Sequence, residues 1–207
     1  MYIPTAFTIT DPAKLAEIMS RYSFALLISR DGNSSFASHL PFLYQNQEGK
    51  LGTLLSHMGR ANRHWQLFSP DEEVLVIFQG PHAYISPTWY VSEVAVPTWN
   101  YVTVHAYGKV RLLKTDAELD AILDETVTKH ESGFAQPWTL RMPEEMKTKL
   151  KQAIVGFKIE LTRVEGKFKL GQNRSKEDQE KMLASLRAQP DADSQVLANF
   201  IAQNSQD

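Results

Sequence analysis

Cysteine is absent from the 207 residues of this chain. The absence excludes disulfide scaffolds, thiolate metal sites and cysteine nucleophiles, and it agrees with a reducing compartment. Long apolar runs are also absent, since the longest, such as FALLI, fall far short of the ~20 residues that a membrane-spanning helix needs. The first residues, MYIPTAFTIT, lack the basic and then apolar stretches of a signal peptide. We therefore expect a cytoplasmic protein with no membrane partner.

An excess of positive charge is missing as well. The formal net charge is −2, so no overall basic field would attract nucleic acid. The most concentrated positive stretch, KFKLGQNRSK, is explained equally well as a solvated surface, and no helix-turn-helix pattern is evident. Direct DNA binding is therefore not expected.

The motifs of several enzyme classes are lacking. Neither GxGxxG nor GxxxxGK[ST] occurs, so a phosphate would have to be held by side chains and helix N-termini. No serine lies in a nucleophile-elbow sequence. The six histidines form no HxH or HExxH pattern, which argues against a metal site. These observations identify no catalytic residue and leave open whether the chain is an enzyme.

The sequence does contain a β-rich middle flanked by helices. The alternation in VTVHAYGKVRL predicts a half-buried strand, and the DGN at 31–33 is typical of a hairpin turn. Helices are expected to begin after the cap Asp11 and after Thr115, which forms a capping-box pattern with Glu118. Further helices are expected at 176–188 and 193–202, and strands at 23–29, 34–42, 51–56, 74–79, 101–113 and 154–164. Short strands with hairpin turns favour an antiparallel barrel or sandwich over a parallel α/β sheet.

The stretch LSHMGRANRHW, residues 55–65, is a candidate phosphate site. A strand is expected to end at Ser56, Gly59 permits a turn, and a helix is expected to begin close to Asn62. Unpaired N–H groups at that helix start, together with Arg60 and Arg63, would suit a phosphomonoester. The alternative is an ordinary strand-to-helix connection whose arginines are solvated, which composition alone favours.

The aromatic residues between 78 and 101 are the second candidate. The segments FQGPHAYISPTWY and WYVSEVAVPTWNY bring Trp89 and Trp99 into a stretch interrupted by prolines. A hydrophobic core would not ordinarily be built from such a pattern. Planar apolar faces with polar edges suit a flat ligand, a subunit interface, or both.

Several blocks in the same order resemble the PaiB family of FMN-binding negative transcriptional regulators. They are MYIP, ASHLPF, SHMGRAN, FQGPHAYISPTWY, VPTWNY, VHAYGKV, IVGFKI and KLGQNR, and they run from Met1 to about Arg174. The resemblance implies a mainly β fold with flanking helices, the FMN-binding split β-barrel of pyridoxamine-phosphate-oxidase-like flavoproteins. It also implies a homodimer with FMN at the interface. Residues 1–174 would form the FMN-binding domain and 175–207 a C-terminal helical extension.

The resemblance also implies a set of cofactor-binding residues. The strand at 36–39 would border the isoalloxazine, the 56–62 turn would meet the ribityl phosphate, Gln79 and Gly80 would approach from the other subunit, and the last three residues of the set would close the site. The full set is Phe36, Ala37, Ser38, His39, Ser56, His57, Arg60, Ala61, Asn62, Gln79, Gly80, Trp99, Asn100, Lys169, Gln172 and Asn173. The related oxidases have an Arg-Lys pair where this chain has Arg60-Ala61, and their terminal arginine motif is absent. Pyridoxamine phosphate oxidation is therefore not expected.

Three functions follow from this resemblance, in order of preference. The first is an FMN-binding negative transcriptional regulator or redox and flavin sensor, whose regulation could act through a protein partner. The second is an FMN-dependent oxidoreductase similar to flavin reductases, and the third is a haem-binding protein, since related split barrels take such ligands. The last expected helix carries apolar Val196, Leu197, Phe200 and Ile201, which could cover a partner or pack on the chain itself.

Overall fold

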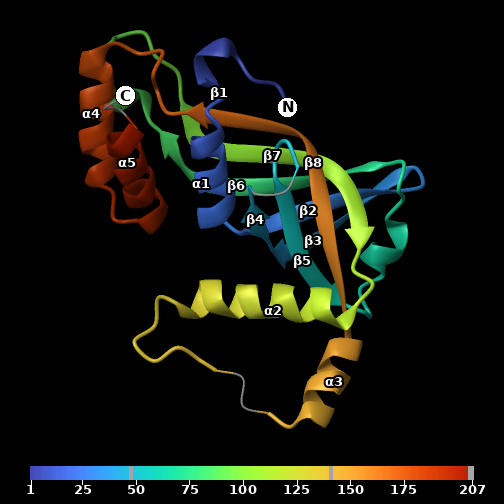
Figure 1. Cartoon of the computed structure of the whole chain (residues 1–207). Coiled ribbons are helices and arrows are strands. Elements are labelled where there is room, and N and C mark those ends of the chain that lie inside the picture. The colour runs from blue at the N-terminus through green and yellow to red at the C-terminus, as the bar shows by residue number, and fades with distance from the viewer. Residues whose placement is uncertain (47–48, 140–141, 205–207) are drawn as a thin grey trace. The chain divides into compact units, whose positions relative to one another are not determined.

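Figure 1 shows a computed structural model of the chain, which describes residues 1–46, 49–139 and 142–204. The strands are β1 Thr8–Ile9, β2 Phe24–Asp31, β3 Ser34–Pro41, β4 Leu43–Gln45, β5 Thr53–Gly59, β6 Glu73–Ile85, β7 Thr98–Leu112 and β8 Ile154–Lys169. The α-helices are α1 Pro12–Arg21, α2 Asp116–Glu131, α3 Glu144–Gln152, α4 Lys176–Arg187 and α5 Ala192–Asn204. Short 3-10 helices are η1 Thr5–Phe7, η2 Arg63–Leu67 and η3 Pro87–Trp89. No helix in the described ranges is long and apolar enough to cross a membrane.

The strands form an antiparallel sheet, as the sequence predicts. Their order is β3-β2-β6-β7-β8-β5-β4, and β1 pairs with β8. The pairs of β2 with β3 and β6, of β5 with β4 and β8, and of β1 with β8 are all antiparallel. Local hairpins and long antiparallel strands therefore replace the crossover helices that a parallel sheet would need.

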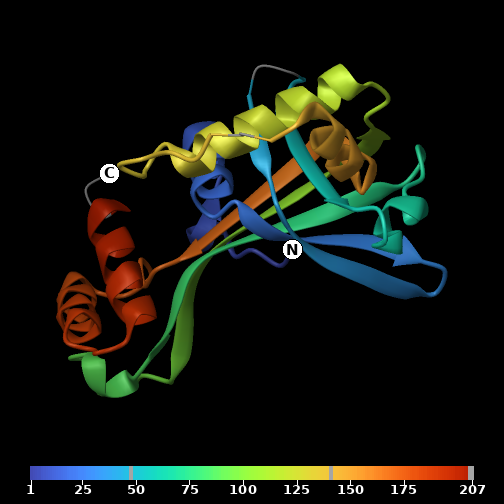
Figure 2. The ribbon, with the colours of Figure 1, turned by 90° about the horizontal axis from the view of Figure 1, so that it is seen from below.

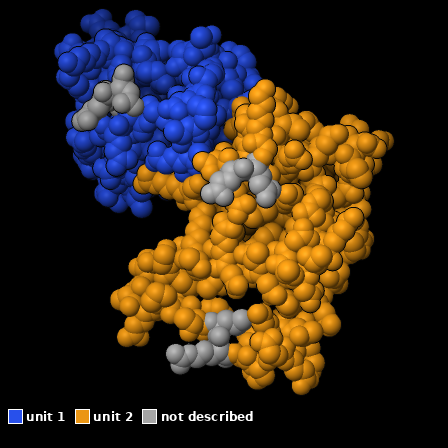
Figure 3. Space-filling model, viewed as in Figure 1, with its two compact units in different colours: residues 1–18, 79–104, 165–207 blue, residues 19–78, 105–164 orange. Residues whose placement is uncertain are grey.

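The chain divides into two compact units, which are coloured separately in Figure 3. Unit 1 comprises residues 1–18, 79–104 and 165–207, and unit 2 comprises residues 19–78 and 105–164. Strands β6, β7 and β8 each contribute residues to both units. The C-terminal helices α4 and α5 belong to unit 1.

The hairpin of β2 and β3 in unit 2 confirms the predicted turn. Asp31 pairs with Ser34 across the two-residue loop of Gly32 and Asn33. The φ of Gly32 is +61°, a conformation that glycine adopts without steric cost. Figure 2 shows the two strands side by side up to this turn.

Three phenylalanines form the aromatic centre of unit 2. Phe42, Phe78 and Phe157 are fully buried. The ring centroids of Phe42 and Phe78 lie 6.0 Å apart and those of Phe42 and Phe157 lie 6.3 Å apart, both pairs edge to face. This is the arrangement that aromatic quadrupoles favour, and it joins residues before β4, in β6 and in β8.

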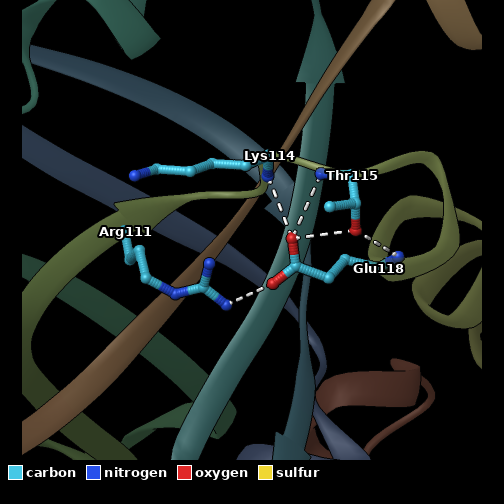
Figure 4. Close-up of polar contacts among 4 residues, drawn as sticks. All are labelled: Arg111, Lys114, Thr115 and Glu118. Carbon is cyan, nitrogen blue, oxygen red and sulfur yellow. Dashed lines mark hydrogen bonds and ion pairs between the residues drawn. The ribbon is translucent and has the colours of Figure 1, made fainter.

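The start of α2 carries the predicted capping box (Figure 4). Thr115 Oγ1 accepts the N–H of Glu118 at 3.2 Å, and Glu118 Oε2 accepts the N–H groups of Thr115 and Lys114 at 3.2 and 3.0 Å. Arg111 Nη2 donates to Glu118 Oε1 at 2.6 Å. The Arg111 bond and then the Lys114 N–H lower the pKa of Glu118 to about 2, because they stabilise the ionised form.

In unit 1, a buried carboxylate attaches α4 to the loop after η3. Asp178 is 1% exposed and accepts the N–H groups of Val91 and Ser92 at 2.8 and 3.0 Å and the hydroxyl of Ser92 at 2.7 Å. Helices α4 and α5 lie side by side (Figure 1). Phe200 of α5 is buried and meets the Phe168 ring edge to face at 5.3 Å. The apolar face of the last helix thus packs largely within its own unit.

Several elements differ from the sequence-based expectation: β1, β4 and α3 are not predicted, and β5, β6, β7 and β8 have other bounds. The sequence predicts that β6 ends at 79, but the strand continues to Ile85 through Gly80 and Pro81. The register of β2 on β6 covers only Leu75–Ile77, so Pro81 lies beyond that pairing and its missing N–H costs no bond to β2. Helix α3 is not predicted by the sequence, because EEMKTKLKQ contains only two apolar residues, Met146 and Leu150.

Candidate functional site

The cofactor residues expected from the sequence fall in both units. Unit 2 holds Phe36, Ala37, Ser38, His39, Ser56, His57, Arg60, Ala61 and Asn62. Unit 1 holds Gln79, Gly80, Trp99, Asn100, Lys169, Gln172 and Asn173. Each unit therefore contributes its own set of candidate side chains.

A buried polar network connects β3 to the turn before η2. Asn62 Nδ2 donates to Ser38 Oγ at 2.9 Å, and the two ring nitrogens of His64 lie 2.9 Å from Ser38 Oγ and 2.9 Å from Ser29 Oγ. His64 is fully buried, and burial followed by the charge of Arg63 lowers its pKa to about 4. The imidazole is therefore neutral at physiological pH. His64 is not among the expected site residues, because nothing local in the sequence signals its distant serine partners.

The expected helix start near Asn62 is a 3-10 helix of five residues, η2. Asn62 is its N-cap, and Asn62 Oδ1 already accepts the N–H of His64 at 3.1 Å. Because the helix dipole sums over aligned peptides, so short a helix contributes little field. Any anion at this turn would therefore depend on side-chain charge.

Arg60 is anchored to the junction of α3 and β8. Its Nε donates to the carbonyl of Gln152 at 2.7 Å and its Nη2 to that of Ile154 at 2.9 Å, while its backbone N–H donates to Ala153 O at 2.8 Å. Ser56 Oγ donates to Pro41 O at 2.7 Å, so this hydroxyl is also bonded to a backbone carbonyl. The side chain of Arg60 is fixed in place without an acidic partner among the described residues.

The four expected flavin-bordering residues of β3 point alternately to two sides of the sheet. Phe36 and Ser38 face His64, and the Phe36 ring lies edge on to His64 at 4.9 Å. Ala37 and His39 are exposed on the other face. A ligand on one face would therefore meet the side chains of only two of the four.

That second face is apolar. On β2 and β6, Leu26, Ile28, Leu75 and Ile77 are only partly buried, whereas their neighbours along each strand are buried. Phe24 is 68% exposed and its ring stacks on His39 at 6.1 Å. Together with Ala37 and His39 of β3, these residues form one largely apolar face of the sheet in unit 2, which we call the β2-β3-β6 face.

In unit 1, the expected residues of the 168–174 turn stabilise the chain itself. Lys169 Nζ donates to Thr98 Oγ1 and, at 2.9 Å, to Trp99 O, and burial followed by the charges of Lys167 and Arg174 lowers its pKa. Gln172 accepts the N–H of Leu170 at 2.7 Å and donates to Phe168 O at 2.6 Å. Asn173 is exposed.

Gly80 permits the close contact of β6 and β7, and Asn100 contacts α4. A Cβ at Gly80 would lie 2.9 Å from Val102 Cβ, so only glycine fits at this approach. Asn100 is buried and donates to Met182 Sδ at 3.3 Å. Gln79 Nε2 lies 3.4 Å from the ring of His82. Trp99 is 54% exposed, so its ring is available to a ligand.

No group of three or more histidine and acidic side chains is arranged to hold a metal ion in the described ranges. The side chains that remain suited to ligand binding are cations, exposed aromatic rings and the half-buried His57, whose pKa burial lowers. Such groups can bind and orient an anionic or planar ligand.

The comparisons with known proteins agree with the predicted resemblance. A family model described as "Putative FMN-binding domain" matches residues 1–163. The chain is 34% identical over 203 residues to the "Protease synthase and sporulation protein PAI 2" of Bacillus subtilis, covering 97% of this chain and 96% of that protein.

Solved structures support the same fold class. The flavocytochrome Anf3 of Azotobacter vinelandii is 12% identical with a TM-score of 0.59, covering 78% of this chain and 69% of that chain. The FAD and heme binding protein of Mycobacterium smegmatis is 12% identical with a TM-score of 0.56, covering 78% and 73%. At these identities the likeness concerns the fold alone. The predicted split β-barrel with flanking helices is confirmed.

The buried His64 predicts a pH dependence of stability. Between ~6.5, the ordinary histidine pKa, and about 4, the unfolded chain binds a proton that the folded chain excludes, so stability should fall as the pH is lowered through this window. His64 should contribute a slope of up to ~1.4 kcal/mol per pH unit. Urea denaturation of the wild type and His64→Gln from neutral pH to about pH 4.5 measures the difference.

His130→Gln on α2 is the matched control, because His130 is exposed. His57 contributes in the same direction, so the difference between wild type and variant is the relevant quantity. Parallel pH profiles for the wild type and His64→Gln would contradict the assignment of the slope to His64.

Proposed function

Because this chain belongs to the family of FMN-binding domains and is a homologue of the Bacillus PAI 2 protein, we propose that it binds FMN and has a regulatory or sensing role. The observation that carries the proposal is the guanidinium of Arg60, a fixed positive charge without an acidic partner among the described residues. A phosphate is the anion whose oxygens best match such a donor.

The donors at the 57–60 turn fit a phosphate. Arg60 uses Nε and Nη2 on backbone carbonyls, which leaves the two N–H groups of Nη1 without an acceptor among the described residues. A Cβ added at Gly59 would meet no atom within 4 Å apart from its chain neighbours, so the space at this turn is open. His57 is neutral at pH 7, because burial lowers its pKa, and it can donate a hydrogen bond. Together these groups would hold the phosphate of FMN.

The flavin ring would lie along β3. The exposed Ala37 and His39 belong to the apolar β2-β3-β6 face, where a planar ring can be removed from water. When bound, FMN supplies reversible oxidation and reduction. The chain would hold and orient the cofactor, and the apolar face would limit the access of water to it.

Arg60→Ala tests the phosphate contact. A charge-assisted hydrogen bond contributes ~1.5–3 kcal/mol, so the variant should bind FMN at least about tenfold more weakly and riboflavin about equally well. Quenching of flavin fluorescence on titration with protein measures both affinities.

Arg30→Ala is the control, because Arg30 is an exposed arginine of the same unit, with its side chain 73% exposed. Arg60→Lys retains the charge and should lose less FMN affinity than Arg60→Ala. Near-UV circular dichroism checks that each variant is folded. An equal loss of affinity for FMN and riboflavin in Arg60→Ala would rule out the phosphate contact.

We further propose that the chain forms a homodimer through the β2-β3-β6 face. An apolar surface with an aromatic ring as exposed as Phe24 is typical of an interface. A second copy of the chain presents the same surface, as a two-fold symmetric interface requires. FMN bound along β3 would then lie close to the partner subunit.

Light scattering should report a particle of about twice the 23.5 kDa chain mass. Phe24→Lys places a charge in the proposed interface and should shift the population towards the monomer at micromolar concentration. Val94→Lys, at a position that is 91% exposed in unit 1, is the control. A monomeric wild type that is saturated with FMN would contradict the proposed dimer.

The regulatory role would not depend on tight DNA binding. With a net charge of −2, the FMN-loaded protein should bind duplex DNA only non-specifically, with a Kd of ~10⁻⁴–10⁻⁶ M at physiological salt. A mobility-shift titration against genomic fragments measures this affinity. A nanomolar, sequence-dependent and salt-tolerant complex would instead identify a direct repressor.

A further inference from the structure

Unit 1 contains a cavity of about 330 Å³ whose lining includes none of the residues proposed to hold FMN. Strands β6 and β7 contribute Tyr84 and Trp99, and η3 contributes Trp89. The chain between α4 and α5 and the start of α5 contribute Asp191 and Asp193. The bonds of Asp178 to Val91 and Ser92 hold α4 next to η3, close to Trp89 of the lining.

The aromatic side of the cavity forms a corner. The rings of Tyr84 and Trp99 are 46% and 54% exposed. Their centroids lie 6.2 Å apart with an interplanar angle of 75°, and the His82 ring lies 6.1 Å from Trp99. The face of an aromatic ring carries negative electrostatic potential, and two faces at nearly right angles can contact one rounded cation from two sides.

The lining of the cavity also contains two aspartates. Asp191 Oδ1 accepts the N–H of Ser194 at 2.8 Å, and this bond, with that of the Ser194 hydroxyl, lowers the pKa of Asp191. Its carboxylate is therefore ionised at neutral pH. Asp193 is exposed in the first turn of α5. Neither carboxylate has a lysine or arginine partner in the part of the chain that the structure describes.

We propose that this cavity binds an organic ammonium ion with N-methyl groups, such as a quaternary ammonium. Methyl groups spread the positive charge over an apolar surface that fits against aromatic rings, whereas a primary ammonium is more strongly hydrated. The carboxylates balance the charge of the cation. The same two carboxylates disfavour the phosphate of FMN, so the proposal gives Trp99 a role other than contact with the flavin.

The test is a titration with choline, followed by isothermal calorimetry and by tryptophan fluorescence. The neutral compound 3,3-dimethyl-1-butanol has the same shape and lacks the charge. We expect choline to bind at least about tenfold more tightly than this alcohol, because the alcohol gains neither the cation–π nor the carboxylate contact. Equal affinity for the two compounds, or no binding of choline at millimolar concentration, would overturn the proposal.

Two variants test the two sides of the cavity. Asp193→Asn removes a charge at constant shape and should weaken choline binding several-fold, whereas Glu177→Gln in the first turn of α4 should not. Trp99→Phe should retain more affinity than Trp99→Leu, because phenylalanine keeps an aromatic face. Equal affinities for these two Trp99 variants would contradict a cation–π contact.

The choline titrations are repeated in the presence of FMN, which distinguishes this proposal from that of the cofactor site. Choline binding should be unchanged by FMN, and flavin fluorescence reports FMN binding independently of choline. Displacement of choline by FMN would assign the cavity to the cofactor and overturn the proposal. Failure of FMN to bind would leave the choline result standing on its own.

Discussion

The two bonds from the Arg60 side chain to backbone carbonyls are the constraint on which the proposed FMN site depends. They join the end of β5 to the residues where α3 ends and β8 begins. An arginine on a surface loop ordinarily loses side-chain entropy when it binds an anion. For Arg60 the loss has already occurred during folding, because the side chain is held by Gln152 and Ile154. The site would therefore be organised before any ligand arrives.

The sequence predicts the fold well where the signal is local. The turn at Gly32, the box of Thr115 and Glu118, and helices α4 and α5 depend on residues within a few positions of one another. The continuation of β6 past Pro81 escapes such a prediction because it depends on where β2 stops pairing with β6. Propensity cannot supply that information, since strand pairing is decided by tertiary structure.

The contacts of the candidate site are even harder to predict from the sequence, because they join residues that are far apart in it. The carbonyl acceptors of Arg60 lie more than ninety positions away in the sequence, and the partners of His64 lie on two other strands. No spacing rule connects them. The family resemblance predicts a flavoprotein fold, which the comparisons confirm. It does not reveal that Gln172 and Asn62 form bonds within the protein. The set of cofactor residues remains a prediction.

The carboxylate of Glu118 has a consequence for acid tolerance. Its pKa is lowered to about 2, so the carboxylate that caps α2 stays ionised and keeps its bonds to the N–H groups at mildly acidic pH. His64, in the same unit, lowers the stability of the folded state at a much milder acidity, because the unfolded chain binds a proton that the folded chain excludes. As the surroundings acidify, the β3–η2 connection should loosen while the start of α2 remains closed, so unit 2 would begin to open next to the proposed flavin strand.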